Sequence, residues 1–297
     1  MMPNAAATLC FAYGSNLNWS DWMAWCGRNG VDPACLKPVG RALLPDMRLA
    51  FDYYSGSRGG GALNVVGEIG CVVEGVLLQV GPGGWDALDA KEGVSTNCYE
   101  RRRRTAILPD GAAMPVAVYE VTVEHQEKFV PPTDEYVAIV QQGMRAHGID
   151  PDPLHAAVAG SETTAPLRDV FAYGTLMRGE PLHHTISHAT NMRAGSTIGR
   201  LHNMVHYPAL LLGGEAPVAG ELMTLSDPAR GLVALDQVED ALPQGAPGGL
   251  YRRTVLRVSE GAGLRPAWAY VMDTVDPVAC PLIPSGDWRR PAAEVVG

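Results

Sequence analysis

The sequence has few of the features that mark secreted, membrane-spanning or zinc-binding proteins. Its six cysteines include no CxxC pair and five of them lie in the first half, which fits neither a zinc-ligand spacing nor the disulfide framework of a small secreted domain. No stretch approaches the roughly 18 consecutive apolar residues that span a bilayer. The stretch from Met1 to Leu9 lacks a basic start and a long apolar run. We therefore expect a cytoplasmic protein that has no membrane partner.

Charge and composition exclude further classes. The chain has 23 Lys and Arg against 32 Asp and Glu, a net charge of −9, which argues against a protein that holds nucleic-acid phosphates. Few of the basic residues are lysines, a bias that suggests GC-rich codons and a bacterial source. With 46% hydrophobic and 19% charged residues, the composition is that of a globular protein and excludes disorder, collagen and coiled coil.

The chain repeats itself. The heptapeptide Phe11–Leu17, FAYGSNL, recurs as FAYGTLM at Phe171–Met177, and the acidic motif LDAKE at Leu88–Glu92 recurs as LDQVE at Leu235–Glu239. In each half a short apolar run with a glycine precedes the acidic motif, and a strand-like stretch with a tyrosine follows it. Four landmarks in one order, twice, predict a tandem duplication with about 150 residues per copy.

The connection between the copies is expected from His155 to Arg168, where turn-forming and small residues show no apolar period. We place the boundary near residue 165 and expect one domain at 1–160 and a second at 168–297.

Each heptapeptide is predicted to form a strand that ends in a tight turn. Gly14 and Gly174 permit a positive φ and a close approach of a ligand to the backbone. Exposed N–H groups at such a turn can bind a carboxylate or a developing oxyanion, although a plain strand-to-helix corner would have the same sequence. A hydroxyl residue, Ser15 or Thr175, follows each glycine, but no histidine has the same offset in both copies, so a Ser-His-Asp triad has little support.

The acidic motifs carry the candidate catalytic groups. Glu92 and Glu239 stand seven residues after Trp85 and Leu232 and four after a leucine, so each glutamate continues the apolar face of a predicted helix. Loss of water raises the pKa of a carboxyl group towards neutrality, which suits a general acid or base. A helix-end glutamate that turns to solvent or pairs with a nearby arginine is the alternative for either copy taken alone.

Other patterns define the fold class and exclude further sites. Short strands outnumber helices and no βαβαβ series is present, so we expect two α+β domains, each with a twisted or barrel-like sheet. The basic run Arg101–Arg104 is expected to be a solvated edge strand rather than a nucleic-acid patch. Two pairs of histidines are spaced four apart but lack a third ligand, so we predict no metal site.

At these residues the sequence resembles the γ-glutamylcyclotransferase superfamily. The first half is similar to the γ-glutamylcyclotransferases proper at Tyr13–Asn16 and Leu88–Val94. The second half is more similar to the γ-glutamylamine cyclotransferase-like branch at Tyr173–Gly179, Leu235–Glu239 and Leu250–Thr254. The second copy departs from the first in two ways: Asp240 stands where the first copy has Gly93, and a Pro-Gly-rich insertion spans Pro243–Gly249.

The resemblance implies two tandem domains, each a small mixed β-barrel with flanking helices. It implies an enzyme of the C–N lyase or acyltransferase type, which needs no cofactor and no metal. Such an enzyme releases 5-oxoproline and a free amine or amino acid from a γ-glutamyl amide, and one role for it is removal of a γ-glutamyl protecting group in a biosynthetic pathway. The implied catalytic residues are Glu92 and Glu239. The implied substrate-binding residues are Tyr13, Gly14, Ser15, Asn16, Tyr119, Tyr136, Tyr173, Gly174, Thr175, Leu176 and Tyr270.

Two alternatives remain open at this point. One copy could be catalytic while the other is a scaffold. The chain could also be a binding protein for small molecules that kept the fold without the reaction.

Overall fold

The computed structural model describes residues 8–161 and 165–290. The chain forms two compact units: the first runs to Leu108 and continues from Met114 to Ala165, and the second comprises Pro109–Ala113 and the chain from Pro166 onward. His155, where we expected the connection to begin, lies inside a helix instead. Residues 162–164 of the expected connection lie outside the described part of the chain.

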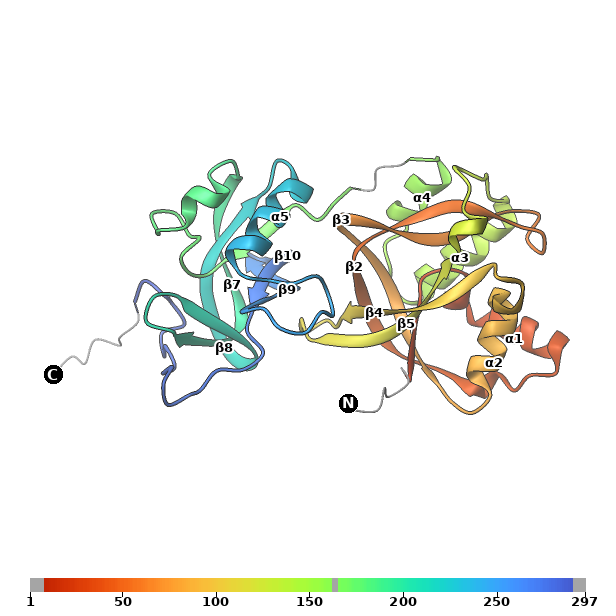
Figure 1. The fold of residues 1–297 in the computed structure, drawn as a ribbon, viewed down its shortest axis with the longest axis horizontal. Helices are drawn as coiled ribbons and strands as arrows, with labels where there is room; N and C mark the ends of the chain where they lie inside the picture. The colour runs from red at the N-terminus through yellow and green to blue at the C-terminus, as the bar shows by residue number, and fades with distance from the viewer. Residues whose placement is uncertain (1–7, 162–164, 291–297) are drawn as a thin grey trace. The chain divides into compact units, whose positions relative to one another are not determined.

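The first unit is built on a closed five-stranded barrel with the order β1-β3-β2-β4-β5 (Figure 1). Its strands β1 and β5 pair in parallel through Cys10 and Ala117, whereas β1 with β3 and β2 with β3 pair antiparallel, so the barrel is mixed. The strand bounds are β1 Leu9–Ala12, β2 Leu36–Ser55, β3 Gly60–Val80, β4 Tyr99–Ile107 and β5 Ala113–Val121.

Helices surround this first barrel. The α-helices are α1 Trp19–Asn29, α2 Gly84–Glu92, α3 Asp134–Ala146 and α4 Asp152–Val158, and the 3-10 turns are η1 Ser15–Leu17, η2 Pro33–Cys35, η3 Val94–Thr96 and η4 Val123–His125. Local sequence explains their ends. Asn18 caps α1 by accepting a hydrogen bond from the backbone of Asp21, and Gly93 ends α2 in the left-handed conformation.

The second unit repeats the barrel with the order β10-β6-β8-β7-β9, coloured green to blue in Figure 1. Its elements are β6 Asp169–Ala172, η5 His183–Ile186, β7 Thr190–Asn203, β8 Pro208–Thr224, α5 Pro228–Val238, β9 Arg252–Glu260 and β10 Gly263–Val271. Helix α5 takes the place of α2, between the third and fourth strands. Among residues 165–290, no helix corresponds to α1 or α3. The expected α+β fold with two mixed barrels is confirmed.

Glycines allow the first and third strands of each barrel, which pair antiparallel, to lie close together. A Cβ atom on Gly75 would lie 2.4 Å from the carbonyl oxygen of Ala12, and one on Gly220 would lie 2.3 Å from that of Ala172. These two glycines belong to the apolar runs that repeat before the acidic motifs. Their recurrence therefore reflects the close pairing of β1 with β3 and of β6 with β8, because any side chain there would push the two strands apart.

The basic run lies in β4, between β2 and β5 of the closed barrel, and so is not the edge strand that we expected. Its side chains are balanced by carboxylates: Arg101 pairs with Asp89, and Arg104 pairs with Glu120 at 2.6 Å. Closure of the barrel removes the edge, which the sequence of one strand alone could not predict. In the described part of the chain, no helix is both long enough and apolar enough to cross a membrane.

Candidate active sites

Each barrel has a cavity between the turn after its first strand and the end of the helix that carries the glutamate. Site 1, in the first unit, is a cavity of about 30 Å³ lined by residues 10–16 together with Leu63, Glu92, Tyr99, Tyr119 and Tyr136. Site 2, in the second unit, is a cavity of about 240 Å³. Its lining residues are Phe171, Ala172, Tyr173, Gly174, Thr175, Leu176, Pro181, Leu182, His206, Tyr207, Pro208, Val238, Glu239, Leu250, Tyr251 and Tyr270.

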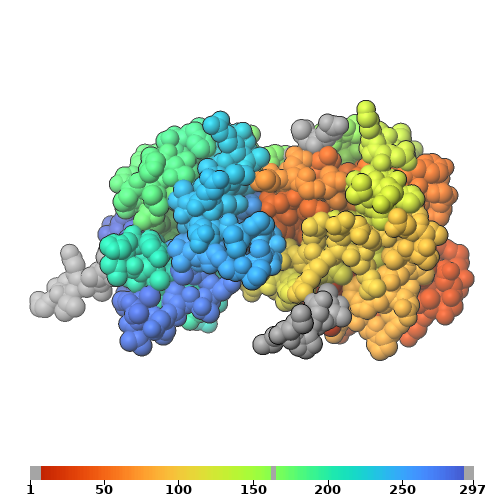
Figure 2. Space-filling model, in the orientation of Figure 1, coloured from red at the N-terminus to blue at the C-terminus, as the bar shows by residue number. Residues whose placement is uncertain are grey.

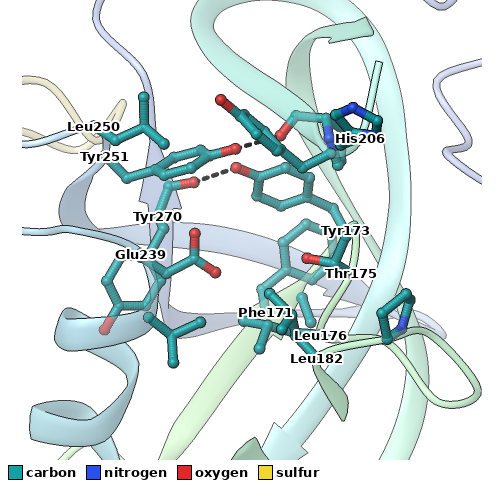
Figure 3. A pocket seen from close by; sticks show the side chains of 16 residues that line it. Phe171, Tyr173, Thr175, Leu176, Leu182, His206, Glu239, Leu250, Tyr251 and Tyr270 are labelled. Atoms are coloured by element: carbon teal, nitrogen blue, oxygen red, sulfur yellow. Dashed lines mark hydrogen bonds between the residues drawn. The ribbon is translucent and has the colours of Figure 1, made fainter. Parts of the chain in front are cut away.

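Glu239 is the ionisable carboxyl group of site 2. It follows the last turn of α5, whose Leu232 and Leu235 are fully buried, and its carboxylate points into the cavity towards the side of Thr175 (Figure 3). Burial raises the pKa of Glu239 from its usual 4.5 to about 7. Near neutral pH this group can therefore both accept and donate a proton.

The turn of site 2 presents free backbone donors. Met177 donates to the carbonyl of Gly174 and Leu182 donates to that of Thr175, which closes the turn. Within the described residues, the N–H groups of Thr175 and Leu176 have no hydrogen-bond partner. Both residues line the cavity, so the turn can offer donors to an oxygen bound there.

The conformational reason that we gave for the glycines of the turns is wrong. Gly174 is absent from the residues with positive φ, and Gly14 has a φ of −115°. Close packing explains Gly174, since a Cβ atom there would lie 2.5 Å from Cγ of Pro208. The same atom on Gly14 would meet nothing nearer than the Tyr136 hydroxyl at 3.6 Å.

Hydrogen bonds from tyrosines to the backbone repeat in the two copies. The Tyr13 hydroxyl donates to the carbonyl of Tyr119 at 2.6 Å, and the Tyr173 hydroxyl donates to that of Tyr270 at 2.5 Å. A second repeated pair consists of Tyr99 donating to Leu63 and Tyr251 donating to Pro208. Each of these four tyrosines donates its hydroxyl hydrogen to a backbone carbonyl oxygen, and the bond holds the wall of the cavity in place.

Tyr119 and Tyr270 donate to the aspartate of the acidic motif rather than to its glutamate. Tyr270 donates to Asp236 at 2.7 Å, and Arg253 pairs with the same carboxylate at 2.9 Å. In the first unit, Tyr119 donates to Asp89 at 2.6 Å, and Arg101 pairs with Asp89 at 3.1 Å. Sequence reasoning missed these aspartates, although their place three residues before each glutamate repeats in both copies.

Site 1 holds its glutamate differently. The side-chain amide of Asn16 donates to Oε1 of Glu92 at 2.7 Å. Lys91 donates to Oδ1 of Asn16 at 2.8 Å and to the Ser15 hydroxyl at 3.0 Å, and lies 3.4 Å from Asp21. The lysine side chain is only 5% exposed, and burial lowers its pKa against the opposing effect of the nearby carboxylates. Lys91 was not among the residues that the sequence indicated.

Tyr136 accounts for the small volume of site 1. It comes from α3, its hydroxyl lies 3.4 Å from the backbone nitrogen of Leu63, and burial raises its pKa to about 12. Arg58 covers the ring at 5.2 Å and pairs with Asp21 at 2.9 Å. The second unit has no described counterpart of α3, which explains why site 2 is larger.

The two departures of the second copy leave the end of its helix intact. Asp240 has a φ of 47°, close to the 68° of Gly93, so the backbone turns in the same left-handed way. The insertion Pro243–Gly249 forms an irregular, largely exposed loop after α5, seen in light blue on the surface in Figure 2. Leu250, directly after this loop, lines site 2.

Comparison with known proteins agrees with the repeated geometry. Two stretches, residues 10–138 and 170–290, match the model of the family described as gamma-glutamyl cyclotransferase, AIG2-like. The chain belongs to this family. The resemblance of both halves to gamma-glutamyl cyclotransferases is thereby confirmed, and the chain is an enzyme of the gamma-glutamylcyclotransferase type.

Individual relatives cover one or both units. A protein of Niallia circulans, described as gamma-L-glutamyl-butirosin B gamma-glutamyl cyclotransferase, is 34% identical over 110 residues, which are 36% of this chain and 69% of that protein. The crystal structure of an uncharacterized Homo sapiens protein shows 25% identity and a TM-score of 0.43, and covers 53% of this chain and 88% of its own. YkqA from Bacillus subtilis shows 13% identity and a TM-score of 0.33, and covers 90% of this chain and 84% of its own.

The two described stretches, 8–161 and 165–290, bring together no group of three His, Cys, Asp or Glu side chains that could hold a metal ion. His202 lies in β7 and His206 in the loop after it, so the four-residue spacing does not place them on one helical face.

Proposed function

We propose that this gamma-glutamylcyclotransferase releases 5-oxoproline and a free amine from a γ-glutamyl amide, with site 2 as the principal site. The observation that carries the proposal is Glu239, a carboxyl group with a pKa of about 7 on the wall of a 240 Å³ cavity. Site 1 has Glu92 in the corresponding place, but its 30 Å³ cavity has room for only about one or two water molecules.

The reaction closes a five-membered ring within the substrate. The α-amine attacks the γ-carbonyl carbon, a C–N bond forms, and the bond from that carbon to the departing amine breaks. Because both reacting groups belong to one molecule, a site that holds the glutamyl chain folded recovers up to about 7 to 11 kcal/mol of the barrier by proximity. The protein then has to position the chain, move protons and stabilise the oxygen of the tetrahedral intermediate.

The residues of site 2 can supply these functions. Glu239 takes the proton that the α-ammonium must lose and returns one to the departing amine, which is efficient because its pKa lies near neutral pH. The unpartnered N–H groups of Thr175 and Leu176 donate to the substrate carboxylate or to the developing oxyanion. Tyr173 and Tyr270 shape the walls, and Glu92, Tyr13, Gly14, Ser15, Asn16, Tyr119 and Tyr136 are the corresponding proposed residues of site 1.

The lining of site 2 favours a leaving group without a carboxylate. Apart from tyrosines, its ionisable lining residues are Glu239 and His206, and none is an arginine or a lysine. A γ-glutamyl amino acid would bring a second carboxylate next to apolar side chains such as Leu182 and Leu250, where no arginine or lysine balances it. A γ-glutamylamine has no such charge, so we propose that class as the substrate.

The name of one relative supports a protecting-group function. The Niallia circulans protein is described as a gamma-glutamyl cyclotransferase of gamma-L-glutamyl-butirosin B. Removal of a γ-glutamyl group during biosynthesis by the present chain stays a proposal.

The deciding experiment is turnover of a panel of γ-glutamyl compounds. We expect 5-oxoproline from γ-glutamylamines at a higher kcat/KM than from γ-glutamyl amino acids of similar size. Binding of panel members without any 5-oxoproline would instead support the alternative of a non-catalytic binding protein. Faster turnover of γ-glutamyl amino acids would support the cyclotransferase but contradict the proposed substrate class.

A further inference from the structure

Two positions next to the glutamates carry polar residues in the first copy and apolar residues in the second. Aligning the heptapeptides places Asn16 on Leu176, and aligning the acidic motifs places Lys91 on Val238. In the first unit the two polar residues form a chain that ends on the carboxylate of Glu92. Both positions are apolar in the second unit, and both line site 2.

We propose that the side chains of Leu176 and Val238 set the protonation of Glu239, and with it the pH range of site 2, by offering its carboxylate neither a side-chain hydrogen-bond donor nor a cation. Within the described residues, the Glu239 carboxylate accepts no hydrogen bond. The part of this inference that concerns pH range rests on the proposed function, whereas the part that concerns protonation does not.

The other groups that face Glu239 do not replace the missing partners. Tyr173 after β6, Tyr251 before β9 and Tyr270 on β10 are neutral phenols, because burial raises the pKa of each well above 10. Asp236 on α5 and Arg253 on β9 form an ion pair with each other. His206, from the loop between β7 and β8, is exposed at the edge of the cavity.

The first unit contains the partners that the second unit lacks. The Asn16 amide is oriented by Lys91, since an ammonium group donates only and the amide oxygen must therefore face it. The amide nitrogen is left pointing at Glu92, where it donates at 2.7 Å. A donor and a nearby cation both favour the charged form of a carboxyl group. Asp21 and Arg58 complete the charged groups around this chain.

The test titrates Glu239 directly. The chain is labelled with ¹³C at glutamate side-chain carboxyls, and the Glu239 signal is assigned by its loss in Glu239→Gln. We expect Leu176→Asn to lower the midpoint of the Glu239 titration by about one pH unit. The matched control is Leu176→Met, which keeps an apolar side chain of similar size and should leave the midpoint unchanged. Equal midpoints in the two variants would overturn the proposal.

A second variant guards against misfolding, because Leu176 is buried. Val238 is 40% exposed, so Val238→Lys adds an ammonium group at the edge of the cavity without disturbing the core. A lowered midpoint in this variant supports the proposal. If Leu176→Asn does not fold, an unchanged midpoint in Val238→Lys overturns it.

Rate measurements separate this inference from the proposed function. In a Glu92→Gln background, the acid limb of 5-oxoproline release should move to lower pH in the same variants and by the same amount as the carboxyl titration. A chain that turns over no γ-glutamyl compound would refute the proposed function, while the titration would still decide whether Leu176 and Val238 control Glu239. If the acid limb of the rate profile stays fixed while the midpoint of the Glu239 titration moves, the part of the inference that concerns pH range is overturned.

Discussion

Tyr270 donates its phenol hydrogen to Asp236 at 2.7 Å, and so joins the strand β10 to the helix that carries Glu239. The bond is partly buried, since Tyr270 is only 3% exposed and the Asp236 side chain is 24% exposed. We expect Tyr270→Phe to destabilise the second unit by about 1.5 to 3 kcal/mol, as is typical of a lost hydrogen bond to a charged acceptor. Denaturant unfolding followed by a probe in that unit measures the effect. An unchanged midpoint would show that the Arg253 pair alone holds Asp236.

The turns of the two sites respond differently to an added methyl group. Gly174→Ala would place Cβ 2.5 Å from Pro208, so the turn must shift and its N–H groups must leave their positions. We expect activity at site 2 to fall by about tenfold or more, since small displacements of positioned groups are costly. The matched variant Gly14→Ala meets its nearest atom at 3.6 Å, an ordinary contact, and should leave the total rate nearly unchanged. Steady-state kinetics of the two variants make the comparison, and equal losses would refute the packing explanation.

The raised pKa of Glu239 also links stability to pH. The folded chain retains this proton up to about pH 7, whereas the unfolded chain loses it near 4.5. The contribution to stability is thus fully present below pH 4.5 and is lost as the pH rises through 7. The rise from 4.5 to about 7 corresponds to at most about 3 kcal/mol, and solvent at this partly exposed group reduces that to about 1 to 2 kcal/mol.

Glu239→Gln removes this dependence because glutamine does not titrate. We therefore expect the variant to gain stability relative to the unaltered chain between pH 5 and pH 8, by about 1 to 2 kcal/mol. Thermal unfolding at a series of pH values gives the difference. A constant difference across this range would mean that Glu239 titrates alike in the folded and unfolded chain.

Most of the correct predictions came from the internal repeat. A duplicated order of landmarks does not depend on the propensity of any single residue, so it predicted the two α+β units, the strand and turn at the start of each unit, and the helix that ends in a glutamate. The repeated glycines Gly75 and Gly220 were noticed as landmarks, but only the close pairing of two strands in the folded barrel explains them. The edge strand expected at Arg101–Arg104 was wrong because barrel closure is a property of all five strands together.

The differences between the two sites could not be obtained in the same way. Tyr136 comes from α3, far along the chain from Gly14, and only the folded structure brings its hydroxyl against the turn. Lys91 stands next to Glu92 in sequence, and at a helix end such a residue is ordinarily solvated. Its burial depends on Asp21 from α1, which is a long-range contact. Positive φ at the turn glycines was predicted from propensity, but packing against Pro208 explains Gly174.

The central claim, that Glu239 moves the protons of cyclisation at site 2, is tested most directly by 5-oxoproline release from Glu239→Gln and Glu92→Gln with a γ-glutamylamine. The account predicts that Glu239→Gln loses at least about 100-fold in kcat while substrate affinity is largely kept, because a glutamine occupies the same space but transfers no proton. Glu92→Gln should retain most of the rate. Full activity in Glu239→Gln, together with its loss in Glu92→Gln, would contradict the account.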